Sequence, residues 1–153
     1  MDCRHEVTIR EARSGDADAI ARVFSASRRL LTFLPDLHTV EEDRRFIAGT
    51  ILRDCAVTVG VADGEIVSFL ARQNEEIRLL HTCPEFIGNG AGSRLIDGAK
   101  SAPVAALELW CFQANMAARR FYERHGFEPI AFTDGKDNEE QTPDVRYRWE
   151  RRA

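Results

Sequence analysis

The hydrophobic period of this chain changes at Cys55, from helical spacing before it to the alternation typical of strands after it. Two alternating runs, residues 56–62 and 66–72, flank the dipeptide Asp63-Gly64. A dipeptide of this kind between alternating runs is a strong signal for a tight β-hairpin. The sequence therefore predicts two adjacent antiparallel strands in the middle of the chain.

Helices are expected before this hairpin and between the strands that follow it. Thr39 and Glu42 have the spacing of a capping box, which marks a helix start, and Pro35 stops the helix before it. The expected strands are 6–13, 56–62, 66–72, 76–82, 105–111, 127–132 and 145–149, and the expected helices end near residues 31, 52, 100 and 125. This order predicts a mixed α/β (α+β) sheet with helices on its faces.

Size and charge limit the classes of protein that the chain can belong to. Its 153 residues fit a single domain over 1–153, with a core that needs neither metal nor disulfides. Hydrophobic residues make up 44% and charged residues 30%, a balance that argues against intrinsic disorder. The net charge is −4 and the isoelectric point is near 5.6, so no overall basic field would gather nucleic-acid phosphates. Nucleic acid is therefore not an expected partner.

The four cysteines, Cys3, Cys55, Cys83 and Cys111, are too far apart for a zinc knuckle or a redox dithiol. We expect reduced thiols in or near the core and no metal site. The first residues lack the apolar run of a signal peptide, and no later stretch is long enough to span a bilayer. A cytoplasmic location without membrane contact is the expectation.

A glycine-rich turn separates the expected strand 76–82 from the helix after it and reads Ile87-Gly88-Asn89-Gly90-Ala91-Gly92-Ser93. Glycines let a ligand approach the backbone, and the free N–H groups of a helix start favour phosphate. The spacing matches neither the P-loop, which needs Gly-Lys-Ser/Thr, nor the dinucleotide fingerprint. The turn therefore either binds a pyrophosphate or serves only the local geometry of the chain.

This turn resembles the core motif of the GNAT N-acetyltransferase superfamily, Gln/Arg-x-x-Gly-x-Gly/Ala, which follows a proline by a few residues, here Pro84. Gly90 and Gly92 stand in the glycine positions. Ile87 stands where the family usually has Arg or Gln, and Asn89 where Lys or Arg is common. The resemblance implies acetyl-CoA as cosubstrate, held by the main chain of the whole turn, and no metal.

Residues 115–127 resemble the second cofactor motif of the same family, an Asn followed by Phe-Tyr-x-x-x-Gly-Phe. Asn115 is a helix N-cap whose side chain can also bond the cofactor, and Gly126 is the helix C-cap. The resemblance assigns to Tyr122 the general acid that protonates the departing CoA thiolate. The alternative is a half-buried tyrosine that only packs its helix against the sheet.

The resemblance also implies a general base and an oxyanion site on the strand before the glycine-rich turn. Glu76 is the candidate base, acting directly or through a water, and a charge at the sheet edge is the alternative. Main-chain N–H near Leu80, where family members have a β-bulge, would meet the oxyanion, and Leu80 and Thr82 would bind the cofactor through their backbone. His81 and Cys83 suggest an acetyl-cysteine intermediate, which we reject because no third group orients the histidine.

For the fold, the resemblance implies a GNAT-like central mixed, mostly antiparallel sheet of about six to seven strands, splayed in the middle, with helices on both faces. The acceptor site of the family lies between the first two helices and the far side of the splayed strands. Phe33, Asp36 and His38 are therefore expected to line it, together with the acidic loop 133–143. That loop either attracts a cationic amine or is only a solvated run of charge.

The expected function is transfer of an acetyl group from acetyl-CoA to the primary amine of a small molecule by direct attack. Two alternatives stay open: acetylation of a protein or peptide amine, and a non-catalytic acyl-CoA-binding module. The presence of both Glu76 and Tyr122 argues against the binding module, which needs no base and acid. Exposed edge strands leave a homodimer open.

Overall fold

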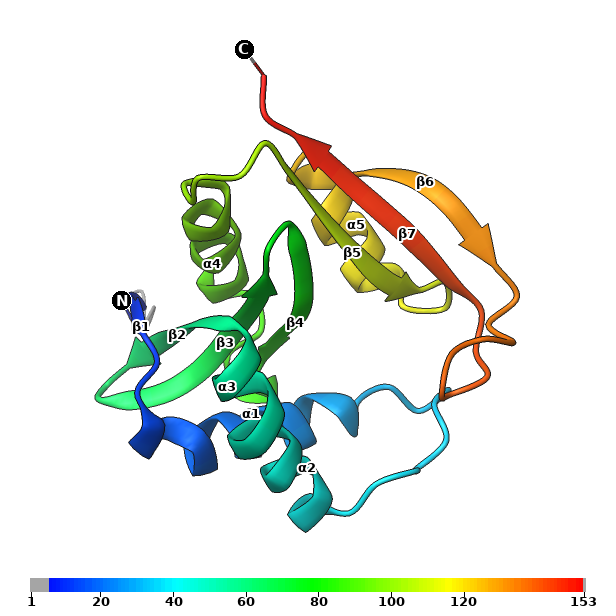
Figure 1. Cartoon of the computed structure of the whole chain (residues 1–153). Helices are drawn as coiled ribbons and strands as arrows, with labels where there is room; N and C mark the ends of the chain where they lie inside the picture. The colour runs from blue at the N-terminus through cyan, green and yellow to red at the C-terminus, as the bar shows by residue number, and fades with distance from the viewer. Residues whose placement is uncertain (1–5, 153) are drawn as a thin grey trace.

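The computed structural model describes residues 6–152, which form a seven-stranded sheet with helices on both faces (Figure 1). The strands are β1 (Thr8–Glu11), β2 (Ala56–Ala62), β3 (Glu65–Gln73), β4 (Glu76–Thr82), β5 (Ala106–Phe112), β6 (Glu128–Thr133) and β7 (Asp144–Glu150). Their order is β1-β2-β3-β4-β5-β7-β6, and every neighbouring pair is antiparallel except β4 and β5. The expected mixed, mostly antiparallel sheet is confirmed.

Two helical layers cover this sheet. The helices are α1 (Ala17–Arg28), α2 (Val40–Phe46), α3 (Leu52–Asp54), α4 (Ala91–Lys100) and α5 (Met116–Arg124), with 3-10 turns at Ser14–Asp16 and Pro84–Phe86. A π-helical turn, Ile47–Ile51, joins α2 to α3. The apolar side chains of α1 and the π-helical turn pack on one face of the sheet, and those of α4 and α5 pack on the other.

Local signals place two element starts where they were predicted. At the β2–β3 turn, Asp63 and Gly64 have φ of 52° and 78°, the left-handed conformation that a tight two-residue hairpin requires at both positions. At the start of α2, the Glu42 amide donates to Thr39 Oγ1 and the Thr39 amide donates to the Glu42 carboxylate, both at 3.1 Å. The predicted hairpin and capping box are confirmed.

The first strand and the first helix are shorter than predicted. The first strand is Thr8–Glu11 rather than 6–13. The first helix ends at Arg28, because the amides of Leu30 and Leu31 bond to carbonyls three residues before them, which tightens the last turn and stops the α-helical ladder. Leu30 is consequently 52% exposed rather than part of the buried stripe.

Alternation along β3 joins the two cores. Phe69 and Ala71 pack with α1 and the π-helical turn, whereas Leu70 between them packs with α4 and α5. All three side chains are at most 2% exposed. Because successive side chains of a strand point to opposite faces, β3 is buried on both sides and anchors both helical layers to one sheet.

β4 and β5 separate almost as soon as they pair. Glu76 and Glu108 are their one pair of register partners, next to a bond from the Glu108 amide to the Glu75 carbonyl at 2.8 Å. A register shift against β3 makes Arg78 an extra residue on β4, a bulge that bends the strand. Figure 1 shows the two strands diverging. The splayed sheet is confirmed. The bulge was expected near Leu80 and lies two residues before it, at Arg78.

Charged side chains connect the two halves of the splayed sheet. Arg146 on β7 donates to Glu76 of β4 at 2.7 Å and to Glu108 of β5 at 3.0 Å. Arg148 and Glu150 continue this row of alternating charges along β7. The Arg146 side chain is only 18% exposed, and covered ion pairs cost more to break than exposed ones. Arg146 therefore ties β4 to β5 and β7 at the point where the strands begin to separate.

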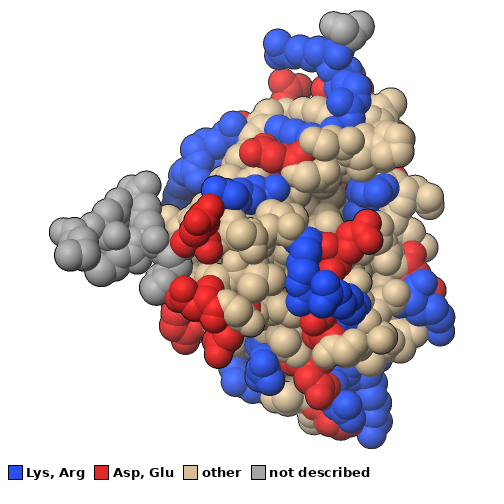
Figure 2. All heavy atoms as spheres, turned by 90° about the vertical axis from the view of Figure 1, so that its left-hand side faces the viewer, with Lys and Arg blue, Asp and Glu red and all other residues tan. Residues whose placement is uncertain are grey.

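The surface carries charges of both signs. Lys and Arg side chains are interspersed with Asp and Glu over the face drawn in Figure 2, without an extended area of one sign. Within residues 6–152, no helix combines the length and the apolar character that crossing a membrane requires.

Candidate active site

Two glycines shape the turn between β4 and α4. Gly88 and Gly90 have φ of 89° and 85°, a left-handed conformation that costs an L side chain about 1–2 kcal/mol. A Cβ atom built at either position would meet nothing within 4 Å. Glycine is therefore needed for the backbone conformation, and the space beside the turn is open to a ligand.

The start of α4 presents main-chain donors to this open space. Gly90 is the N-cap and brings no capping side chain. The Arg94 amide is the first to reach a helical carbonyl, that of Gly90, at 3.1 Å. The N–H groups of residues 90–93 therefore lie at the positive end of the helix dipole without helical acceptors, which suits a phosphate.

Gly92 and Ser93 bring α5 against the same turn. A Cβ at Gly92 would lie 3.2 Å from Cζ of Phe121, so the missing side chain lets α5 approach closely. Ser93 Oγ is hydrogen-bonded to His125 Nε2 at 3.0 Å. The two segments that resemble cofactor motifs therefore form one continuous surface.

Side-chain charge contributes little at this turn. Ile87 is 60% exposed and apolar, and Asn89 is half-buried. Arg119 is held on α5 and β7, because its Nε donates to the Tyr147 hydroxyl at 3.1 Å. Arg94 is exposed on the first turns of α4. Binding of a phosphate here would therefore depend mainly on backbone amides and the helix dipole.

Backbone amides of β4 face the gap that the departing β5 leaves. The Cys83 amide donates to the Val67 carbonyl of β3 at 2.7 Å. Because successive amides of a strand point to opposite sides, those of Leu80 and Thr82 point away from β3 and into the gap. The Leu80 side chain packs against the same apolar cluster as Tyr122. Both residues lie where the cofactor prediction needs them, and the contact itself stays a prediction.

Tyr122 packs its ring in the core and leaves its hydroxyl without a partner. The side chain is 9% exposed, and its ring centroid lies 5.4–6.1 Å from those of Phe121, Phe127 and Tyr147. No group within residues 6–152 hydrogen-bonds the hydroxyl. Burial raises the pKa of this phenol, which is therefore protonated at neutral pH. The hydroxyl itself is not enclosed, because Ser68 Oγ is the one fully buried polar side-chain atom of residues 6–152 that lacks a partner, so the phenol can meet solvent or a ligand.

Asn115 caps α5 as predicted. Its Oδ1 accepts a hydrogen bond from the Ala118 amide at 3.2 Å. The side-chain NH₂ group of Asn115 makes no hydrogen bond to the described residues. The cap therefore keeps two donors for solvent or a ligand.

Glu76 lies at the closed end of the gap between β4 and β5. Its carboxylate accepts from Arg146 at 2.7 Å, and its side chain is 40% exposed. The neighbouring Glu75 carboxylate instead accepts from the Ala106 amide at 3.1 Å, at the start of β5. Glu75 is therefore a structural residue, and the role of Glu76 as a base stays a prediction.

His81 and Cys83 do not form a nucleophile and base pair. His81 Nδ1 is hydrogen-bonded to Ser27 Oγ at 3.0 Å, and the ring stacks on Phe69 with centroids 5.7 Å apart. The Cys83 thiol donates to the Glu85 carboxylate at 2.6 Å. Burial, and then this hydrogen bond, raise the pKa of Cys83 above its ordinary value. The arrangement gives no support to an acetyl-cysteine intermediate.

Cys55 and Cys111 are also free. Cys55 is half-buried, and Cys111 is buried with its pKa raised to about 12 by that burial. Cys3 lies outside the described residues. Within those residues, no three His, Cys, Asp or Glu side chains gather as a metal site requires.

The α1–α2 connection, residues 29–39, reaches across to the β6–β7 loop (Figure 1). His38 Nε2 lies 2.6 Å from the Glu139 carboxylate, and its Nδ1 lies 3.4 Å from Glu42. Hydrogen bonds to Glu42 and Glu139 raise the pKa of His38. Phe33 meets Phe112 of β5 edge-on, with centroids 6.0 Å apart. The predicted acceptor residues therefore lie on the two segments that enclose the far side of the splayed strands.

The acidic β6–β7 loop is a folded unit. Asp144, which is 8% exposed, accepts from the Thr133 hydroxyl and from Asn138 Nδ2, the latter at 3.2 Å. Gly135 has φ of 83°, and a Cβ there would overlap the backbone of Thr142. These contacts fix the loop and hold its acidic side chains opposite the α1–α2 connection.

Two arginines of this region were not predicted from the sequence. Arg146 is the partner of Glu76, and Arg28, at the end of α1, lies 3.5 Å from Glu140 of the β6–β7 loop. Each contact joins segments far apart in the chain, so no local pattern announces it. Only the alternation of β7, which puts Arg146 and Arg148 on one face, points to a charged side of that strand.

Comparison with known proteins adds a family to this geometry. The chain matches the acetyltransferase (GNAT) domain family over residues 53–129, a span that holds β4, the glycine-rich turn, α4, β5 and α5. An uncharacterized N-acetyltransferase of Archaeoglobus fulgidus is 33% identical over 133 residues, which cover 74% of this chain and 88% of that protein.

Solved structures share the fold at low sequence identity. Apo YjaB from Escherichia coli has a TM-score of 0.76 at 19% identity, over 94% of this chain and 97% of that chain. Ard1 from Thermoplasma volcanium has a TM-score of 0.76 at 20% identity, over 96% and 99% of the two chains. The PaiA N-acetyltransferase of Thermoplasma acidophilum, in complex with coenzyme A, has a TM-score of 0.72 at 17% identity, over 95% and 99%.

The buried His81 makes folding stability depend on pH. Burial, with the nearby charge of Arg28, lowers the pKa of His81 from 6.5 to about 3. Between pH 6.5 and about pH 3, the unfolded chain binds a proton at His81 and the folded chain does not. Proton binding therefore favours the unfolded state, and the free energy of unfolding decreases as the pH falls below 6.5. The loss reaches about 2 kcal/mol at pH 5.

Urea unfolding at pH 8 and pH 5 measures this loss. The His81→Phe variant keeps an aromatic ring but has no site for a proton, and it should lose about 2 kcal/mol less than the wild type. The His38→Gln variant is a control of opposite sign, because the raised pKa of His38 stabilises the fold at low pH. Equal losses for wild type and His81→Phe would contradict a buried neutral His81.

Proposed function

Because the chain belongs to the GNAT acetyltransferase family, we propose that it moves the acetyl group of acetyl-CoA to the primary amine of a small molecule by direct attack. The observation that carries this proposal is the gap between β4 and β5, which main-chain amides of β4 face and whose Leu80 packs against the same apolar cluster as Tyr122. Family membership makes the chain an acyltransferase and supports acetyl-CoA as its cosubstrate. The acceptor and the roles of individual residues are the proposal.

Acetyl-CoA would bind with its pyrophosphate at the start of α4 and its thioester in the gap. The amides of residues 90–93 would donate to the phosphates, and those of Thr82 and Leu80 to the pantetheine arm and the thioester carbonyl. The Asn115 NH₂ group is a further donor beside the gap. The similarity to PaiA, which was solved with coenzyme A, supports this cofactor.

The acetyl transfer needs a proton acceptor, an oxyanion site and a proton donor. Glu76, directly or through a water, takes a proton from the amine, and the nitrogen attacks the carbonyl carbon. The Leu80 amide donates to the oxyanion that forms. The C–S bond then breaks, the sulfur takes the phenolic proton of Tyr122, and the nitrogen of an amine that arrived protonated loses its second proton to solvent. Solvent returns a proton to Tyr122 and removes the one on Glu76, which restores the enzyme.

A small acceptor suits the enclosed far side of the gap better than a protein does. The contact between His38 and Glu139, at 2.6 Å, holds the α1–α2 connection to the β6–β7 loop. A cavity of about 370 Å³ lies under this connection, which is the size of a small-molecule site. A protein chain would need an open groove here.

Removal of one hydroxyl tests Tyr122 as the proton donor. Tyr122→Phe should lower kcat about 100-fold or more, with no change in the affinity for acetyl-CoA and little change in stability, because the hydroxyl has no partner within residues 6–152. CoA release in the presence of a panel of amines measures kcat.

Tyr147→Phe is the matched control for this test. The Tyr147 hydroxyl donates to Glu123 at 2.6 Å and accepts from Arg119 at 3.1 Å, so its loss should cost about 1–2 kcal/mol of stability and leave kcat unchanged. A Tyr122→Phe enzyme as active as the wild type would contradict the role of Tyr122. Acetyl-CoA binding without turnover of any amine would indicate a binding module instead.

A pH–rate profile tests Glu76 as the base. Without it, only amine that is already neutral reacts, so Glu76→Gln should lower kcat/KM about 100-fold at pH 7 and recover steadily as the pH rises. Glu108→Gln is the control, because Glu108 also pairs with Arg146, at 3.0 Å, but lies on β5. Equal losses in both variants, independent of pH, would show that the ion pairs matter and that the base lies elsewhere.

A further inference from the structure

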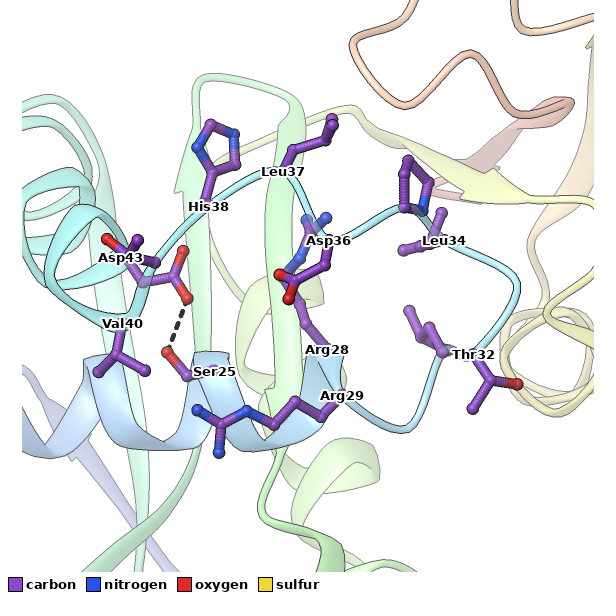
Figure 3. Close-up of a pocket in the computed structure, with 13 residues that line it drawn as sticks. Ser25, Arg28, Arg29, Thr32, Leu34, Asp36, Leu37, His38, Val40 and Asp43 are labelled. Atoms are coloured by element: carbon purple, nitrogen blue, oxygen red, sulfur yellow. Dashed lines mark hydrogen bonds between the residues drawn. The ribbon is translucent and has the colours of Figure 1, made fainter.

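A cavity lined by both polar and apolar side chains lies under the α1–α2 connection (Figure 3). The end of α1, the connection itself and the start of α2 form its walls. One side is fixed by a hydrogen bond from Ser25 of α1 to Asp43 of α2, at 2.7 Å. The cavity is therefore part of the fold and has a volume suited to a small ligand.

Arg28 places a positive charge in this cavity, and no hydrogen bond to the protein fixes its guanidinium. In Figure 3 its side chain rises from the end of α1 toward the connection, whereas Arg29 runs back along the helix. The Arg28 side chain is only 25% exposed, and its guanidinium lies 5.6 Å from the centre of the Phe24 ring. None of its N–H groups is hydrogen-bonded to a residue of 6–152.

The carboxylate that pairs with Arg28 lies farther away than a charge-assisted hydrogen bond requires. Glu140 lies at 3.5 Å, whereas a charge-assisted hydrogen bond measures about 2.7–2.9 Å. The guanidinium N–H groups of Arg28 that no protein acceptor takes are available to water or to a ligand in the cavity. A guanidinium has two parallel N–H groups that match a carboxylate, and the position of Glu140, itself only 14% exposed, indicates that a carboxylate is the group this place accepts.

Arg28 lies on the acceptor side of the gap between β4 and β5. Ser27, the residue before it, is hydrogen-bonded to His81 of β4 at 3.0 Å. Phe24, on which Arg28 lies, meets the same imidazole with ring centroids 5.1 Å apart. His81 directly follows Leu80, whose amide points into the gap. One layer of side chains therefore separates Arg28 from the main chain where the thioester would bind.

We propose that Arg28 selects the acceptor by binding its carboxylate, and that the acceptor is an amine with a carboxylate near it, such as an amino acid with a free α-carboxyl group. This inference rests on the proposed acetyl transfer in the same gap. Two hydrogen bonds to Arg28 replace its loose contact with Glu140 and direct the amine of the acceptor toward β4. The side-chain amine of a lysine within a protein has no such carboxylate beside it, so the proposal also separates small acceptors from proteins.

Matched pairs of acceptors test the proposal. Each pair consists of an L-amino acid, with a small, branched, aromatic or charged side chain, and the carboxamide of the same amino acid, and kcat/KM is measured for both. The amine of a carboxamide is less basic and therefore more often neutral, so intrinsic reactivity favours the carboxamide. The wild type should nevertheless prefer the free acids by about 10- to 100-fold in kcat/KM, the value of a charge-assisted pair. Arg28→Gln should abolish this preference by slowing the acids alone.

Arg29→Gln is the control, because Arg29 borders the same cavity and is the next residue along the chain. It should keep the wild-type preference. Arg28→Lys keeps the charge but not the paired N–H groups, so it should keep only part of the preference for free acids. This variant replaces Arg28→Gln in the test if Arg28→Gln does not fold. Equal use of acids and carboxamides by the wild type, or a preference that survives in folded Arg28→Gln, would overturn the proposal.

Calorimetry separates this proposal from the acetyl transfer on which it rests. With CoA bound, the N-acetyl amino acids should bind the wild type at least about 10-fold more tightly than their carboxamides, and Arg28→Gln should lose this difference. Such binding without turnover of any amine would contradict the transfer reaction and support the carboxylate site. Turnover of amines without a difference between acids and carboxamides would support the transfer and contradict the site.

Discussion

The early separation of β4 from β5 is the constraint on which the rest of the structure depends. A parallel pair that kept its register would bond the amides of Leu80 and Thr82 to β5 and close the gap. Here one register pair, Glu76 with Glu108, is followed by the bulge at Arg78. Arg146 bridges the strands on one face, and an apolar cluster with members from both halves fills the other. The sheet can therefore open in its middle without falling into two.

The gap has two sides of different chemistry. On one side, α4 and α5 offer main-chain amides, a helix dipole and the phenol of Tyr122, with few charged side chains at the turn itself. On the other side, the α1–α2 connection and the β6–β7 loop meet through ionisable groups, with His38 on Glu139 and Arg28 near Glu140. Backbone donors can bind a cofactor whatever side chains the turn carries. The side chains of connecting segments, in contrast, can determine which acceptor binds.

Much of this fold could be predicted, because its elements begin at local signals. Asp63-Gly64 specifies a hairpin by its conformation, Thr39 and Glu42 satisfy each other's amides, and Asn115 caps α5. Each of these signals acts over at most three residues, so the sequence shows it directly. The glycine-rich turn is of the same kind, since its φ values require glycine.

The contacts that define the acceptor side could not be predicted in this way. His38 and Glu139 are 101 residues apart, and their meeting depends on the insertion of β7 between β5 and β6, which alternation does not reveal. The bulge was expected near Leu80 and lies at Arg78, because its place is set by the pairing with β3. Arg28 gave no signal, since an arginine at a helix end is normally a solvated residue.

An NMR titration of the ¹⁵N-labelled protein with CoA tests most directly whether the gap is the cofactor site. The structure predicts that the amides of Leu80, Thr82 and residues 90–93 shift and exchange more slowly with solvent when CoA binds. The amide of Ile130 on the edge strand β6 should not respond. CoA binding that leaves the amides of β4 and the glycine-rich turn unchanged would contradict the account.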